Sequence, residues 1–132
     1  MEFNIQFSGG LRVDAITDKG RVIGTDQDPE FGGEGSAPEP YTLFMASLGT
    51  CAGVYVLKFC KSHDLPVEGI HLVQRSTYDE QKRRMASFDI EVHVPASFPE
   101  KYRKALARSA NLCAVKKTIL DPPDFEVTTV VD

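Results

Sequence analysis

The sequence predicts an α+β fold in which β-strands flank one long apolar helix. Three patterns carry this prediction. Residues 2–23 alternate apolar and polar side chains between turns, residues 41–62 are apolar over the length of a long helix, and a charged turn separates two alternating segments at 70–78 and 86–94. With two helices and a strand towards the C-terminus, the expected order is βββ–α–ββ–αα–β.

The N-terminal part of the sequence reads as a three-stranded meander. Apolar and polar residues alternate over Glu2–Phe7 and again over Leu11–Ala15, which is typical of half-buried strands. The turn sequences Gly9–Gly10 and Asp18–Gly20 separate these strands from each other and from a third, which starts at Val22–Ile23.

A long loop is expected next. Residues 26–40 read DQDPEFGGEGSAPEP, and such a concentration of glycine and proline sustains neither a helix nor a central strand. Loops of this length are often functional or mobile. Too few residues precede the loop to form a core of their own, so we expect one domain over residues 1–132.

The central helix is predicted from Tyr41 to about Ser62. Hardly any residue in it is polar before Lys58. A helix that is apolar nearly all round is buried, either at the centre of a fold or in a dimer interface.

The second half of the chain completes the pattern. The expected elements are strands at Ile70–Tyr78 and Ala86–Val94, helices at Pro99–Leu112 and Leu112–Leu120, and a last strand at Phe125–Val131. Asn111 is expected to cap the last helix, which would place Cys113 at its second position, where free N–H groups favour a thiolate.

Composition excludes several classes of function. The 132 residues carry a net charge of −4, whereas nucleic-acid-binding proteins usually have a basic excess. The start of the chain has no basic and apolar signal sequence, and no stretch approaches the ~18 apolar residues of a membrane span. We therefore expect a cytoplasmic protein that binds neither nucleic acid nor a membrane.

The three cysteines are the main chemical feature. An odd number is not typical of a secreted disulfide scaffold, so free thiols in a reducing compartment are expected. Cys60 follows Cys51 by nine residues, which places them on opposite faces of one helix and predicts a packing role for Cys60. Cys51 and Cys113 form a redox pair if the fold brings their helices together, which the sequence leaves open.

Other kinds of site find little support in the residues. Cys60 and His63 lack a second ligand pair at zinc-finger spacing, the glycines of the loop lack the Lys-Ser/Thr of a phosphate loop, and no serine lies in a nucleophile elbow. We expect no metal and no cofactor.

The motifs around the two helical cysteines resemble those of the OsmC/Ohr superfamily, which comprises osmotically inducible protein C and the organic hydroperoxide resistance proteins. The segment Pro40–Cys51 is similar to its first helix signature and Cys113–Val115 to its second. The start FSGGLRVDA, the glycine-containing loop and the last strand match as well, and the short form is closest to the OsmC-like subgroup.

The resemblance implies a thiol-dependent peroxidase that reduces organic hydroperoxides in oxidative-stress defence. Cys51 would attack the peroxide and become a sulfenic acid, Cys113 would condense with it to a disulfide, and an external dithiol would reduce the pair. The family fold is an intertwined homodimer with packed central helices. Phe44, Leu48 and Tyr55 would form a wall for the alkyl group.

One part of the family pattern is missing. In the organic hydroperoxide resistance branch, a Glu follows the helix-opening Pro and pairs with an Arg that stabilises the thiolate. In this sequence, Tyr41 and Thr42 occupy the positions of that Glu. Arg12 and Arg21 are the candidate cations. Cys51 lies beyond the first turn of its own helix, so without a cation burial should raise its pKa.

Two other functions remain open on the sequence. A redox-sensing or apolar-ligand-binding module would use the same pocket and thiols without efficient turnover. A purely structural homodimer would use the cysteines as core residues.

Overall fold

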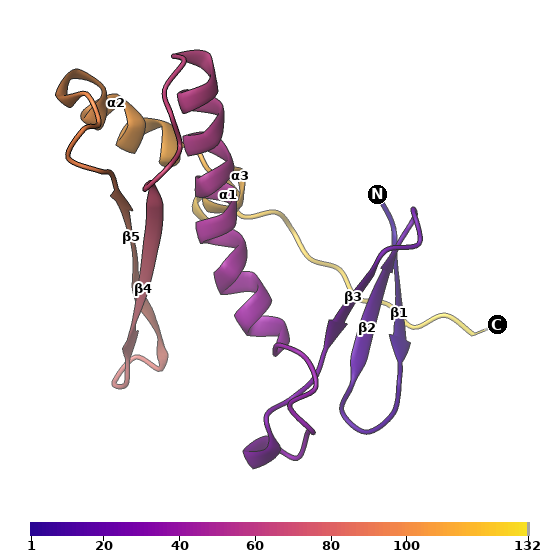
Figure 1. Ribbon diagram of the computed structural model, residues 1–132. Helices are drawn as coiled ribbons and strands as arrows, with labels where there is room; N and C mark the ends of the chain where they lie inside the picture. Colours follow the sequence, from indigo (N-terminus) through magenta and orange to yellow (C-terminus); the bar gives the residue numbers. More distant parts are fainter. Residues whose placement is uncertain (132) are drawn as a thin grey trace. The chain divides into compact units, whose positions relative to one another are not determined.

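The computed structural model describes residues 1–131, and it has the predicted α+β composition of helices and antiparallel strands (Figure 1). Its contacts divide the chain into two compact units, residues 1–46 and 47–132, and each is described by itself. The single domain expected over residues 1–132 stays a prediction.

The first unit contains the predicted meander. Strands β1 (Phe3–Phe7), β2 (Val13–Thr17) and β3 (Val22–Thr25) form an antiparallel sheet in the order β1-β2-β3. The turn between β1 and β2 needs Gly9 and Gly10, because both have positive φ angles that side chains rarely adopt.

A buried carboxylate organises the loop that follows. Asp26 accepts hydrogen bonds from the Ser36 hydroxyl (2.7 Å) and from the backbone N–H groups of Gln27 (2.8 Å), Ser36 (2.9 Å) and Glu34 (3.3 Å). These donors, with Ser36 first, lower the pKa of Asp26 to about 2. A Cβ at Gly33 would overlap the Gln27 carbonyl, so the loop is tightly closed as well as long.

Helix α1 (Pro40–Ser62) begins in the first unit and continues into the second. Its buried residues form a single stripe at a spacing of four: Leu48, Ala52, Val56 and Cys60. The other apolar side chains of α1 are half-buried or exposed, and the exposed ones include Tyr41, Val54 and Leu57. The helix is therefore less buried within this chain than its composition predicts.

The hydropathy of α1 corrects the expectation that no stretch of the chain approaches a membrane span. An 18-residue window of α1 has a mean hydropathy of 1.6, and the helix is long and apolar enough to cross a membrane by these two measures. Core helices of soluble proteins meet the same measures, and the buried stripe of α1 packs on protein.

The second unit contains a β-hairpin, two helices and the main core. Strands β4 (His71–Asp79) and β5 (Arg84–His93) pair antiparallel, with a register shift between Thr77 and Tyr78. Helices α2 (Glu100–Ala110) and α3 (Ala114–Leu120) follow. The core cluster consists of Ala52, Val56 and Cys60 from the α1 stripe and three further residues: Phe98, Leu106 and Ala110.

The last predicted strand is wrong for this structure. Residues 125–131 have no regular secondary structure, and their apolar side chains, such as Phe125 and Val131, are exposed. An alternating apolar segment becomes a strand only when another strand pairs with its backbone. Among the described residues no strand pairs with this segment.

Candidate functional site

Two of the three cysteines meet where α3 begins. Cys51 lies in the middle of α1, and Cys113 is the residue immediately before α3. The side chains of Cys113 and Cys51 are hydrogen bonded, and the Cys113 sulfur lies 3.8 Å from the Leu48 carbonyl oxygen. Cys51 is half-buried and Cys113 is buried, and both thiols are free. The structure thus brings together the pair that the sequence left open.

The cap of α3 differs from the prediction. Asn111 ends α2, and Cys113 itself caps α3. The backbone of Cys113 is extended, and its sulfur accepts the backbone N–H of Lys116 at 3.4 Å. This is the usual geometry of a helix N-cap, in which a side-chain acceptor satisfies one of the free amides of the first turn.

The surroundings of Cys51 lower its pKa. The largest cause is a hydrogen bond from the backbone N–H of Val115, followed by the Cys113 thiol, and the Ala114 N–H and the positive charge of Lys58 add to them against the effect of burial. Burial does raise the pKa, but these donors outweigh it, so the net rise expected for Cys51 without a cation is wrong. That expectation considered only the start of α1, whereas the donors belong to the start of α3.

Cys113 responds in the opposite direction. Burial raises its pKa above the ordinary thiol value, and the neighbouring Cys51 adds to the increase, although the Lys116 N–H opposes it. The expectation of a thiolate at Cys113 is therefore wrong. The pair is asymmetric: Cys51 is the sulfur prepared to carry a negative charge, and Cys113 is the thiol prepared to donate a hydrogen bond to it.

A cavity of about 690 Å³ opens beside Cys113. Its walls come from four elements of the second unit, with Leu48 and Ala52 from α1, apolar residues of β5, and parts of α2 and α3. The charged residues that line it are all cationic: Arg103, Arg108 and Lys116. The contribution of β5 to the cavity was not predictable, because the alternation of residues along β5 does not identify the element that its apolar face packs against.

The residues predicted to form a substrate wall are divided. Leu48 lines the cavity, whereas Tyr55 does not. Tyr55 is half-buried, and its carbonyl oxygen accepts a hydrogen bond from the Ser109 hydroxyl at 3.1 Å. Phe44 belongs to the first unit, where its ring centroid lies 5.4 Å from that of Tyr41. Their role as a substrate wall stays a prediction.

The two predicted cations also belong to the first unit. Arg12 Nε donates to Asp14 Oδ1 at 3.2 Å, so its guanidinium already has a carboxylate partner. Arg21 lies between β2 and β3, and its backbone N–H donates to the Thr17 hydroxyl. Their part in stabilising the Cys51 thiolate stays a prediction.

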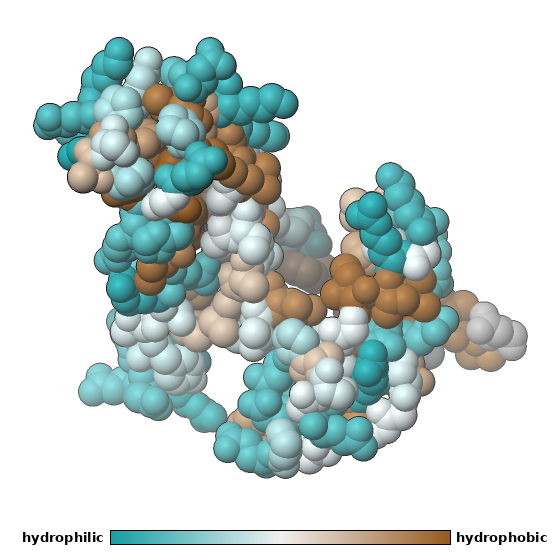
Figure 2. Space-filling model, viewed as in Figure 1, coloured by the Kyte–Doolittle hydropathy of each residue, from teal (hydrophilic) through white to brown (hydrophobic). Residues whose placement is uncertain are grey.

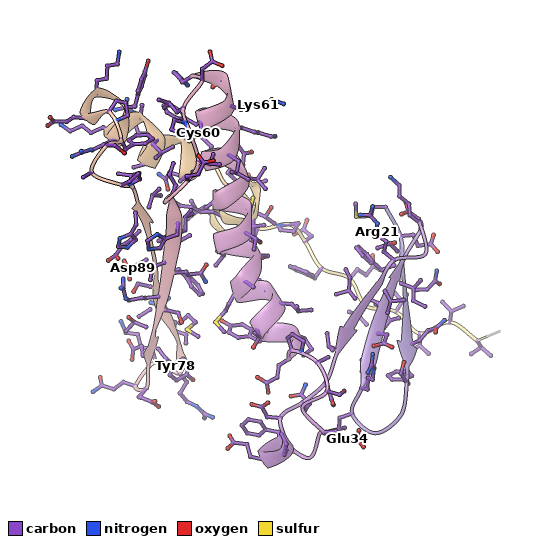
Figure 3. All side chains as sticks on the ribbon, in the orientation of Figure 1. Arg21, Glu34, Cys60, Lys61, Tyr78 and Asp89 are labelled. Carbon is purple, nitrogen blue, oxygen red and sulfur yellow. The ribbon has the colours of Figure 1, made fainter. Side chains whose placement is uncertain are left out.

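Cys60 lies away from this site. It is fully buried in the core with Ala52 and Val56, and burial raises its pKa. Figure 3 shows Cys60 on the side of α1 that faces α2, and Lys61 pointing out from the other side. Over residues 1–131, no group of three or more His, Cys, Asp or Glu side chains is arranged to hold a metal ion.

Comparisons with known proteins identify the fold and the family. Residues 33–128 match the sequence model of the OsmC-like protein family. An osmotic stress induced and detoxification response protein from Psychrobacter arcticus is similar in structure, with a TM-score of 0.73, 22% identity, and coverage of 88% of this chain and 85% of that one.

Two organic hydroperoxide resistance proteins share the fold. The one from Legionella pneumophila has a TM-score of 0.59 and 19% identity, and the match covers 90% of this chain and 89% of that one. The one from Elizabethkingia anophelis has a TM-score of 0.58 and 15% identity, with 89% and 88% covered. No curated protein sequence matches the chain. Because the family match covers most of the chain, including both cysteines of the site, this protein belongs to the OsmC-like protein family, within the OsmC/Ohr superfamily.

Proposed function

We propose that this protein is a thiol-dependent peroxidase that reduces organic hydroperoxides to alcohols in oxidative-stress defence. The observation that carries the proposal is the asymmetric pair, in which the Cys51 sulfur has a lowered pKa and hydrogen bonds to Cys113. Membership of the OsmC-like family supports the proposal, as does the shared fold of proteins named for organic hydroperoxide resistance.

The first step uses the thiolate of Cys51. Its sulfur attacks the terminal oxygen of the hydroperoxide, the O–O bond breaks, and the alkoxide takes up a proton to leave as an alcohol. Cys51 is oxidised to a sulfenic acid and the peroxide is reduced. A lowered pKa favours this step, because the thiolate is the nucleophile.

The second step uses Cys113. Its sulfur attacks the sulfenic sulfur of Cys51, an S–S bond forms, and the hydroxyl group leaves as water. An external dithiol then reduces the disulfide by thiol–disulfide exchange and is itself oxidised. The hydrogen bond between the two side chains indicates that little movement is needed before they react. No cofactor takes part in the cycle.

The cavity beside Cys113 supports an organic rather than an inorganic peroxide. Its walls are mainly apolar, and its volume of about 690 Å³ lies within the usual range for small-molecule sites. An alkyl group of the substrate would be removed from water there, next to Cys113, which lines the cavity and is hydrogen bonded to Cys51.

We also propose a homodimer that functions in the cytoplasm. The exposed side of α1 carries Val54 and Leu57, and the C-terminal segment exposes further apolar residues, including Phe125 and Val131. Figure 2 shows apolar side chains on the surface of both units. A second copy would cover these side chains and give the C-terminal segment a strand to pair with.

The decisive test is turnover of tert-butyl hydroperoxide with dithiothreitol as reductant. We expect the native chain to turn over and the Cys51→Ser variant to be inactive. The Cys60→Ala variant should retain activity, since Cys60 is in the core. Activity in Cys51→Ser would refute the proposal. Oxidation of Cys51 once, without turnover, would favour the redox-sensing alternative instead.

A further inference from the structure

The α1 helix carries two charged residues, Lys58 and Lys61. They lie at different angles from Cys51 around the helix axis. At about 100° per residue, Lys58 lies about 20° from Cys51 around the helix axis, whereas Lys61 lies about 80° away. Lys58 is thus on the same face as Cys51, about 10 Å further along the axis. Side chains of a helix lean towards its N-terminus, so the Lys58 ammonium is directed back towards Cys51.

Tyr55 holds this lysine in place. It lies about 40° from Cys51 around the axis and between Cys51 and Lys58 along it. The Lys58 Nζ atom lies 5.6 Å from the centroid of the Tyr55 ring, a distance typical of a cation–π contact. Cys51, Tyr55 and Lys58 therefore form one column on α1.

The other cations of the second unit are not among the groups that lower the pKa of Cys51, although Arg103 and Arg108 line the cavity beside Cys113. Lys116 follows Cys113 closely in sequence, but its ammonium contacts the Asn111 side-chain oxygen. The Lys61 side chain points away from α1 on the side opposite Cys60 (Figure 3). The charged and titratable side chains that act on Cys51 in this structure are Cys113, the N-cap of α3, and Lys58 from its own helix, and no carboxylate of the described chain is among them.

We propose that Lys58, held over the Tyr55 ring, is a positioning residue that stabilises the thiolate of Cys51. The inference rests on the proposed function only in taking Cys51 as the reacting thiol. The lowering of the Cys51 pKa by Lys58 supports it.

The test is the pH profile of Cys51 alkylation by iodoacetamide in the reduced, full-length chain, followed by mass spectrometry of the Cys51 peptide. The Lys58→Met variant keeps the length of the side chain and removes its charge. We expect the midpoint of the profile to rise by roughly half a pH unit to one pH unit, less than for a close buried charge, because Lys58 is exposed in the single chain.

Three controls separate charge from structure. Lys61→Met removes the same charge from the same helix and should leave the profile unchanged. Lys58→Arg should restore the native profile. In about 1 M NaCl, where the Debye length is about 3 Å, the native profile should move towards that of Lys58→Met.

Coincident profiles for the native chain and Lys58→Met at low salt would overturn the inference, as would an equal shift in Lys61→Met. The salt series on the native chain needs no variant, so a failure of Lys58→Met to fold would not remove the test. The alkylation profile also needs no peroxide. If the chain shows the pH shift but no turnover, the peroxidase proposal fails and the role of Lys58 stands. If the chain turns over but shows no shift, only the role of Lys58 fails.

Discussion

The side chains of Cys113 and Cys51 are hydrogen bonded, and the sulfur of Cys113 also accepts the backbone N–H of Lys116. One cysteine thus caps α3 and orients the start of that helix. The amides of Ala114 and Val115 at this start then point at the other cysteine. The position of Cys113 therefore contributes to the lowered pKa of Cys51.

This relationship predicts a double effect of Cys113→Ala. The variant loses a hydrogen bond to the Cys51 thiolate, so the pKa of Cys51 should rise. It also loses the disulfide partner, so the Cys51 sulfenic acid should persist after one equivalent of peroxide. We expect a strong dimedone adduct on Cys51 by mass spectrometry, against a weak one in the native chain. Equal adducts in both proteins would show that Cys113 does not resolve the intermediate.

The two thiols should also differ in their own pH profiles. Because the pKa of Cys51 is lowered and that of Cys113 is raised from the ordinary value of 9.0, alkylation of Cys51 should reach its half-maximal rate at the lower pH. Peptide mapping after timed alkylation of the reduced chain measures both residues in one sample. A reversed order would assign the attacking role to Cys113.

Much of the fold and part of the site were predictable from the sequence. Alternation and turn residues identified β1 to β5, and a long apolar run identified α1, because these signals are local in the chain. The same alternation wrongly indicated a strand at residues 125–131, since pairing depends on a neighbour that local sequence does not specify. The pairing of Cys51 with Cys113 was recognisable from family motifs.

The acidity of Cys51 was not predictable, because its donors come from residues more than sixty positions away. Asn111 was a reasonable cap by residue type, and a shift of the helix start to Ala114 changed which sulfur receives the amides. Lys58 was visible in the sequence at the i+7 position from Cys51. The sequence does not show that Lys58 contacts the Tyr55 ring, because that contact depends on the side-chain conformation.

The Asp26 carboxylate predicts a specific loss of stability in acid. Its pKa is about 2 in the folded chain against 3.8 for the free group, so the folded state holds the ionised form more tightly. The stabilisation is therefore fully present above pH 3.8 and is lost as the pH falls towards 2. The Asp26→Asn variant should unfold at a lower temperature than the native chain at pH 6. The difference between the two should narrow at about pH 2, as measured by circular dichroism. A constant difference across this range would contradict the role of the charge.

The burial of the Cys60 thiol predicts that a polar substitution there lowers the free energy of unfolding and leaves the reactivity of Cys51 unchanged. Cys60 is fully buried among apolar residues, so the hydroxyl of Cys60→Ser would be placed in a core of apolar side chains. An unsatisfied buried hydroxyl costs about 1–3 kcal/mol of unfolding free energy. Urea unfolding should show this loss for Cys60→Ser and a smaller one for Cys60→Ala. The rate of Cys51 alkylation should be unchanged in both, and a large change would place Cys60 in the site.

The exposed side of α1 predicts how the proposed homodimer can be separated. Val54 and Leu57 are about half exposed in the single chain and lie on the side of α1 away from its buried stripe. If a second copy covers them, the double variant Val54→Glu and Leu57→Glu would bury two carboxylates in an apolar interface, at a cost of several kcal/mol. We expect the dimer Kd to rise at least roughly 100-fold, which corresponds to about 2.7 kcal/mol. Light scattering after size-exclusion chromatography should then report the 14.6 kDa monomer.

The matched control adds the same kind of charge elsewhere. Gln81→Glu lies in the exposed turn between β4 and β5, and it should leave the dimer intact. Because α1 also carries Cys51, the alkylation profile of the double variant shows whether association affects the thiol. A native chain that is monomeric at all concentrations would exclude the second copy. The apolar side of α1 would then require another partner, because exposed apolar patches on soluble monomers are usually small.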